Sequence, residues 1–121
     1  MEIQGNALLL RIFTGSLDKV NGTPLYEIIV YAARKYGIAG STVTRGIMSY
    51  GANSFIHTAK ILAISDDMPI IIEMIDEEEK VKGFIRIIEK YFENAKYGGL
   101  VTTQKVEVLH YKSGKKEDNR L

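Results

Sequence analysis

Histidine and cysteine are the side chains most often used to bind metals or to act as nucleophiles and bases. This sequence of 121 residues contains two histidines and no cysteine. His57 and His110 lie far apart, and neither has the paired spacing of a metal site. The absence of cysteine excludes disulfides, thiolate catalysis and thiolate ligands. The sequence therefore predicts no metal site. An imidazole at His57 could be a proton-sensitive contact, although a solvated loop histidine is the simpler interpretation.

The acidic run from Asp76 to Glu79 could indicate a carboxylate cluster for acid–base catalysis. It directly precedes an apolar helical pattern, so helix capping explains it without chemistry. Asp76 is a suitable N-cap, Glu79 follows three residues later as in a capping box, and the carboxylates complement the helix dipole. No nucleophile–base pair, metal set or phosphate-loop motif is present in the sequence. The sequence therefore favours a protein that is not an enzyme.

A long segment from Gly37 to Pro69 separates the two most periodic parts of the chain. It begins with β-branched residues at 42–44, continues through glycine-punctuated turns, and returns through a strand-like run at 58–64. A long polar loop carried on two strands commonly has a functional role, because it can vary and move while the sheet stays fixed. By itself this pattern predicts a loop that contacts a ligand or a partner.

The composition is that of an ordinary globular protein, with 45% hydrophobic and 26% charged residues. The length predicts a single domain over 1–121, with a core at about 6–111 and a polar tail at 112–121. Lysine and arginine number 16 against 15 acidic residues, so no overall field would recruit nucleic acid. The apolar run Ala7–Leu10 is interrupted by Arg11 and is too short for a signal peptide or a membrane span. We expect a soluble cytoplasmic protein.

Apolar periodicity predicts two amphipathic helices. The first begins with Thr23 as N-cap and Pro24 in the first helical position, and it ends at Gly37. The second follows Asp76 and fades between Asn94 and Gly99. The first apolar stripe consists of Leu25, Ile28, Ile29, Ala32 and Tyr36, and the second of Val81, Phe84, Ile85, Ile88 and Phe92.

Strands are predicted at about Asn6–Phe13, Ser41–Met48, Ile70–Ile75 and Leu100–Tyr111. The order predicts an α+β fold, the ferredoxin-like βαββαβ sandwich, with a long loop between the second and third strands. The first strand has the composition of one buried on both faces. Apolar residues at consecutive positions in these strands would leave an apolar sheet face uncovered in a monomer, so we expect a homo-oligomer.

Three motifs together carry a resemblance to a known family: GIAGSTVTRG at 37–46, SYG at 49–51 and IHTA at 56–59. From about Leu8 to Tyr111 the sequence resembles the PII-like family of domain of unknown function 190. This family is similar in turn to PII signal-transduction proteins. Those are ferredoxin-like homotrimers that bind adenine nucleotides between subunits and present a mobile loop to partner proteins.

The resemblance places the PII features on particular residues. Thr42–Thr44 resembles the strand that enters the PII loop, and Tyr50-Gly51 resembles its aromatic-glycine step, with one extra residue between them. Ala52-Asn53 stands where PII proteins have Arg-Gln, so a phosphate-directed guanidinium is missing. The tyrosine setting that some PII proteins modify is also missing.

Lys105 lies where PII proteins have a phosphate-binding lysine, and residues 102–104 replace a Gly-Asp-Gly step. His110 and Lys112 replace two arginines near the C-terminus. The resemblance thus implies a ligand-binding set and a partner-loop set. The first is Gly51, Thr102, Thr103, Lys105, His110 and Lys112, and the second is Ser49, Tyr50, Asn53, Ser54 and His57.

The implied effector is ATP, ADP or AMP, and the implied partners are other copies in a homotrimer and a regulated protein such as a membrane transport protein. Each residue also has a purely structural interpretation: Lys105 as a solvated strand lysine, the threonines as strand formers, and Gly51 as a residue with unusual backbone angles. Two alternatives remain open: a ligand-free structural trimer of the stress or metal-tolerance type, and a weak enzyme using the same cleft.

Overall fold

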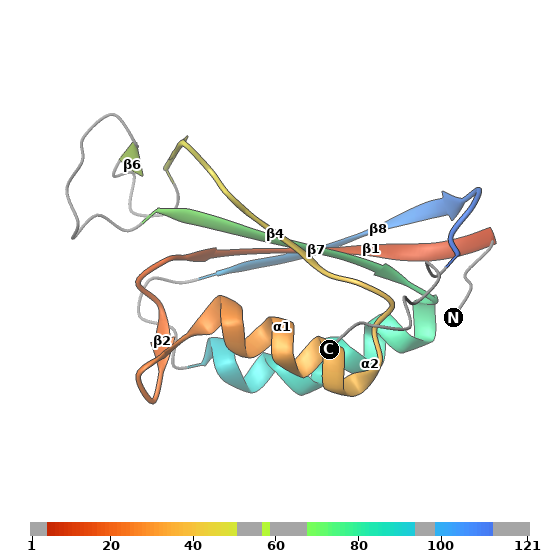
Figure 1. Ribbon diagram of the computed structural model, residues 1–121, viewed down its shortest axis with the longest axis horizontal. Coiled ribbons are helices and arrows are strands. Elements are labelled where there is room, and N and C mark those ends of the chain that lie inside the picture. The colour runs from red at the N-terminus through yellow and green to blue at the C-terminus, as the bar shows by residue number, and fades with distance from the viewer. Residues whose placement is uncertain (1–4, 51–56, 59–67, 94–98, 113–121) are drawn as a thin grey trace, which may run out of the picture.

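The computed structural model describes residues 5–50, 57–58, 68–93 and 99–112. One four-stranded antiparallel sheet, in the order β4-β7-β1-β8, forms one layer, and two helices cover one of its faces (Figure 1). This is the predicted ferredoxin-like fold. The strands are β1 (Gly5–Gly15), β4 (Thr42–Arg45), β7 (Pro69–Asp76) and β8 (Leu100–Val108), and the helices are α1 (Leu25–Tyr36) and α2 (Glu78–Phe92).

The two central strands alternate strictly between the two faces of the sheet. Leu8, Leu10 and Ile12 of β1, with the even-numbered residues 70–74 of β7, are buried under the helices. The odd-numbered residues face the opposite side, where Leu9 and Phe13 are half-buried and Ile75 is 38% exposed. The interpretation of β1 as buried on both faces therefore does not hold within one copy of the chain, because both helices pack on the same side.

The start of α1 differs from the predicted start. Thr23–Pro24 forms the short strand β3, which pairs with β2 (Lys19–Val20) across a two-residue turn at Asn21-Gly22. Both turn residues have positive φ, as a type I′ hairpin requires, and this Asn-Gly signal was missed in the sequence. Pro24 is consequently extended and serves as the N-cap, without a side-chain cap. The end of α1 is as predicted, with Gly37 left-handed at φ 96°.

The prediction of the apolar stripe of α1 was only partly correct. Leu25, Ile29 and Ala33 are buried, whereas Ile28 is half-buried and Tyr36 is 37% exposed. The predicted stripe of α2 is confirmed: three of its residues are fully buried, and the other two pack against the core. The buried residues are Val81, Phe84 and Ile88, and the packed ones are Ile85 and Phe92.

The predicted capping box at the start of α2 was wrong. The helix begins at Glu78, its N-cap is Glu77, and no side chain caps it. Asp76 is the last residue of β7 and is 1% exposed. Its carboxylate does not act as the predicted N-cap. Its Oδ1 accepts from the N–H of Glu77, the next residue, and its Oδ2 accepts from the N–H of Ala39 on another segment.

The second strand is shorter than predicted. β4 ends at Arg45, and after a bend β5 (Met48–Ser49) pairs with β6 (His57–Thr58) as a separate two-stranded ribbon. The bend is tight, because a Cβ at Gly46 would lie 2.7 Å from Cγ of Pro69. Beyond Thr58, the predicted return strand lies outside the described residues. The last strand also ends early, at Val108, where the chain leaves the sheet.

Candidate functional site

A cavity of about 510 Å³ opens on the sheet face opposite the helices. Its floor is made by β1 and β7, one wall by the segment that enters β4, and another by the residues that follow β8. The lining residues are Leu9, Ala39, Gly40, Ser41, Thr42, Glu73, Met74, Ile75, Val108, His110 and Tyr111. A volume in this range is typical of small-molecule sites, which are mostly apolar with a few polar groups.

A polar row crosses the same sheet face from one edge of the sheet to the other, and two of its members, Thr42 and Glu73, line the cavity. Thr42, Glu73, Arg11 and Thr102 lie directly opposite one another on β4, β7, β1 and β8. Arg11 Nε donates to Glu73 Oε2 at 2.8 Å, and the Thr102 hydroxyl donates to the Arg11 carbonyl at 3.4 Å. Both members of the ion pair are more than a third exposed, so the pair remains hydrated in this copy of the chain.

Glu73 was not recognised from the sequence, and Arg11 was noted as the residue that interrupts the apolar run Ala7–Leu10. A signal was present: each is a single charged residue inside an otherwise apolar strand, in LLLRIF and IIIEMI. A charge in such a run is costly unless it has a partner. Only the pairing of β1 with β7 shows that each is the partner of the other.

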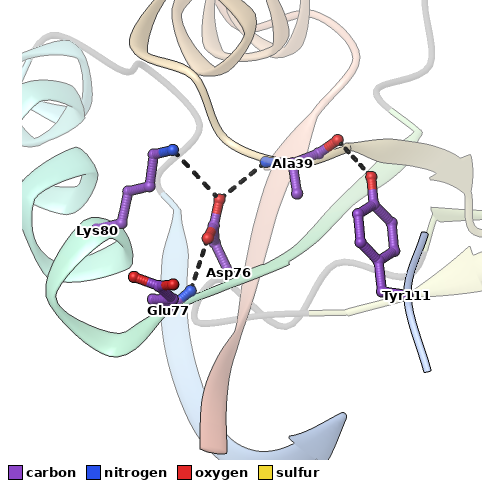
Figure 2. A network of polar contacts seen from close by, with 5 residues as sticks. All are labelled: Ala39, Asp76, Glu77, Lys80 and Tyr111. Atoms are coloured by element: carbon purple, nitrogen blue, oxygen red, sulfur yellow. Dashed lines mark hydrogen bonds and ion pairs between the residues drawn. The ribbon is translucent and has the colours of Figure 1, made fainter. Parts of the chain in front are cut away.

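The two walls of the cavity touch each other. The Tyr111 hydroxyl donates to the Ala39 carbonyl at 2.9 Å, and the N–H of Ala39 donates to Asp76 Oδ2 at 2.9 Å (Figure 2). Lys80 Nζ lies 3.9 Å from the same carboxylate oxygen. The segment leading into β4 is therefore held from the core side by Asp76 and from the other side by Tyr111.

The predicted ligand residues do not gather at one place within a single copy. His110 lines the cavity, and Thr102 lies on the same sheet face. Thr103 and Lys105 lie opposite Leu10 and Leu8 and so belong to the helix-side face.

Five of the six predicted ligand residues are exposed: Thr102, Thr103, Lys105, His110 and Lys112. Gly51 lies outside the described residues.

Lys105 lies near the start of α2, where its charge acts on Glu78. The pKa of Glu78 is lowered chiefly by its hydrogen bond to Lys82 and by the Lys82 charge, and Lys105 makes the smallest contribution. Lys82 Nζ lies 3.1 Å from Glu78 Oε1, and the two residues are one helical turn apart. Lys105 is thus an exposed lysine in surroundings of mixed charge.

The predicted partner loop can be followed only at its two ends. Ser49 lies opposite His57 in the β5–β6 ribbon, and Tyr50 is 72% exposed. Asn53 and Ser54 lie outside the described residues. Both ends of the loop are fixed: the N–H of Gly46 donates to the Pro69 carbonyl at 2.8 Å. The N–H of Met68 also donates to Ser16 Oγ at 2.9 Å.

Metal ligands do not converge in the part of the chain that the structure describes: no group of three histidine, aspartate or glutamate side chains lies close enough together to hold an ion. Within the same residues, neither helix has the length and apolar content needed to cross a membrane. The groups that line the cavity are apolar surface, hydroxyls, one carboxylate and one imidazole.

The arrangement of the sheet and the two helices is the fold of PII-like proteins. Among solved structures, the chain is similar to CPII of Thiomonas intermedia K12, described as a nitrogen regulatory PII-like protein bound to ADP, AMP and bicarbonate. The TM-score is 0.65 at 18% identity, covering 85% of this chain and 88% of that one. At this identity the similarity shows the fold.

Relatives at the sequence level are closer. A UPF0166 protein of Aquifex aeolicus is 37% identical over 102 residues, covering 84% of this chain and 92% of the relative. A UPF0166 protein of Methanocaldococcus jannaschii is 34% identical, covering 78% and 84%. Residues 7–108 match the family model DUF190, described as an uncharacterized ACR. The chain belongs to the DUF190 family, as its motifs predicted.

Proposed function

We propose that this protein is a PII-like regulatory protein rather than an enzyme. It works as a homotrimer and binds a small anionic effector, an adenine nucleotide such as ATP, ADP or AMP, in clefts between subunits. The loop at 49–68 then signals the occupancy of these clefts to a partner protein, for which a membrane transport protein is a candidate.

The cavity on the open sheet face is the observation that carries this proposal. One of its walls comes from the residues after β8 and includes His110, for which the PII resemblance implies a ligand contact. The other wall comes from the segment that enters β4. Its apolar floor at Leu9 and Ile75 suits a flat base or a sugar, and Ser41, Thr42 and Glu73 offer hydrogen bonds at its edge. CPII, which shares the fold, binds ADP and AMP.

The charge around the cavity supports binding between subunits. Among the described lining residues the one carboxylate is Glu73, and lysine and arginine are absent. A nucleoside fits these surroundings, but a phosphate needs cations. Lys105 and Lys112 are the cations that the resemblance implies, and Lys105 lies on the helix-side face of β8. Because β8 is an edge strand, we infer that the edge of a second copy supplies the cation to the cavity of the first.

The position of the loop in the chain supports a role in reporting the state of the cavity. Thr42 lines the cavity and is the first residue of β4, and the chain reaches the loop within a few residues of the end of β4. At the far end of the loop, Met68 is hydrogen-bonded to Ser16, the residue after β1. An effector that binds one position of β4 more tightly than another would therefore shift the loop population.

Thermal unfolding with a ligand panel tests the proposal. The panel contains ATP, ADP, AMP, cyclic nucleotides, simple anions and divalent metals. A ligand at 100 times its Kd stabilises a site by about 2.7 kcal/mol, which corresponds to a shift of several degrees in Tm. We expect a shift for one or more adenine nucleotides, and a smaller shift in Lys105→Ala and Glu73→Ala.

Lys35→Ala is the matched control, since Lys35 is an exposed lysine in the last turn of α1, on a helix that contributes nothing to the cavity. Its nucleotide shift should equal that of the parent protein. A panel without any shift would contradict the effector proposal and favour the ligand-free structural trimer. Hydrolysis of nucleotide by the purified protein, lost in Lys105→Ala, would instead favour the enzyme alternative.

A further inference from the structure

Residues 109–112, which we call the C-terminal strap, return across the end of the sheet after β8. The strap begins at β8, one edge of the sheet, and its Tyr111 contacts Ala39, which precedes β4 at the other edge. Strands lie about 4.8 Å apart, so the strap and the Tyr111 side chain together span roughly 14 Å. Lys112 adds a single-residue β-bridge.

The backbone of Ala39 makes a hydrogen bond on each of two sides, as Figure 2 shows. The two bonds differ in their exposure to solvent. The N–H of Ala39 donates to the carboxylate of Asp76, which is 1% exposed. Its carbonyl accepts from the hydroxyl of Tyr111, and the Tyr111 residue is 37% exposed. Water replaces the second bond more readily than the first, because the second bond is exposed and the first is partly buried. Ala39 is therefore a fixed wall, and the strap is a releasable one.

This difference matters because both walls line the same cavity. Ala39 and Gly40 lie on one side, and His110 and Tyr111 lie on the other. The Tyr111–Ala39 bond joins them, so a molecule in the cavity is enclosed on that side while the bond is intact. The cavity opens on that side when the strap detaches.

We propose that Tyr111 is a latch: its hydrogen bond to Ala39 holds the strap closed, and its release sets the rate at which a ligand enters and leaves the cavity. The latch rests on the proposed function for the identity of its ligand, but its closure is a property of the ligand-free chain. Tyr111 acts here as a positioning residue. The ring provides part of the wall, and the hydroxyl keeps that wall in place.

Tyr111→Phe tests the latch, because it keeps the ring and removes only the hydroxyl. Tyr31→Phe is the matched control, since Tyr31 is 64% exposed on α1 and does not line the cavity. The first measurement is amide hydrogen exchange in the ligand-free protein, followed by mass spectrometry over 39–42 and 109–112. The loss of one exposed hydrogen bond should accelerate exchange in both segments by about 3- to 10-fold. Exchange in α2 should not change.

The second measurement is the dissociation rate of a fluorescent ADP analogue, which should rise by a similar factor in Tyr111→Phe and stay constant in Tyr31→Phe. Unchanged exchange in Tyr111→Phe would overturn the latch. Faster exchange with an unchanged dissociation rate would overturn its control of ligand exit. If the parent protein binds none of the adenine nucleotides, the proposed function fails, and the exchange measurement alone decides whether the latch exists.

Discussion

The buried carboxylate of Asp76 accepts a hydrogen bond at 2.9 Å from the backbone N–H of Ala39, 37 residues earlier in the chain. This contact joins the end of β7 to the segment that follows α1, and thus ties a wall of the cavity to the core. The same carboxylate accepts at 2.7 Å from the N–H of Glu77 at the entrance to α2. One side chain therefore positions both the second helix and the cavity wall.

Replacing Asp76 by alanine should destabilise the protein. Two partly buried backbone hydrogen bonds would lose their acceptor, and an unsatisfied buried group costs about 1–3 kcal/mol. We expect urea denaturation to show a loss of at least about 2 kcal/mol in the free energy of unfolding for Asp76→Ala. Glu79→Ala, which removes an exposed carboxylate three residues later, should change the free energy of unfolding little. Equal losses in the two variants would show that Asp76 has no special structural role.

Gly83 in α2 faces Tyr36 in α1, and a Cβ at position 83 would overlap the Tyr36 hydroxyl oxygen. An alanine in a helix interior is normally better than glycine by about 1 kcal/mol. We expect Gly83→Ala to give no such gain in stability in the parent protein. The Tyr36 ring packs on the Phe84 ring, with 5.7 Å between the ring centroids, and this contact restricts its movement.

The gain should return when Tyr36→Phe removes the hydroxyl, since the next ring carbon lies 3.4 Å from the added Cβ. A double-mutant cycle measured by denaturation isolates this coupling between the two helices. If the effects of Gly83→Ala and Tyr36→Phe simply add, the contact between α1 and α2 at this point is looser than the structure shows.

The pKa of Glu78 should depend on Lys82. The hydrogen bond and the charge of Lys82 hold the Glu78 pKa below its ordinary value of 4.5. The stabilisation from a lowered carboxyl pKa is complete above the unfolded value and is lost as the pH falls through the folded value. Here it is lost below pH 4.5. In Lys82→Ala, NMR titration should show the Glu78 pKa moving up towards 4.5.

Lys35→Ala, which removes a lysine from the other helix, provides the comparison for this titration. It should leave the Glu78 pKa at its parent value, because Lys35 is not among the causes of the shift. A Glu78 pKa that stays the same in Lys82→Ala would show that the two side chains do not pair in solution.

The proposal of a homotrimer predicts that the open sheet face is buried between copies. Ile75 on that face and Ile87 on α2 are each 38% exposed, which makes them a matched pair. A lysine buried in an interface without a partner is costly. We therefore expect Ile75→Lys to sediment as a smaller species than the parent protein, while Ile87→Lys keeps the parent size. A parent protein that sediments as a monomer at micromolar concentration would contradict the trimer directly.

The order of elements could be read from the sequence because each is specified locally. The apolar residues of α2 recur with the helical period, and all five predicted positions of its stripe face the core. Gly37 ends α1 because a left-handed residue there favours glycine. The family followed from local motifs in the same way. Where local signals compete, the prediction failed: Thr23-Pro24 is a good helix start, but the Asn21-Gly22 turn pairs it as a strand.

The candidate site is the part that only the tertiary structure decided. Arg11 and Glu73, Asp76 and Ala39, and Tyr111 and Ala39 are pairs whose members lie 62, 37 and 72 residues apart. No local pattern couples such distant residues, because their contact depends on strand order and register. The sequence by itself determined the elements, their apolar faces and the family. Folding of the sheet then brought the residues after β8 against those before β4, and this contact created the cavity.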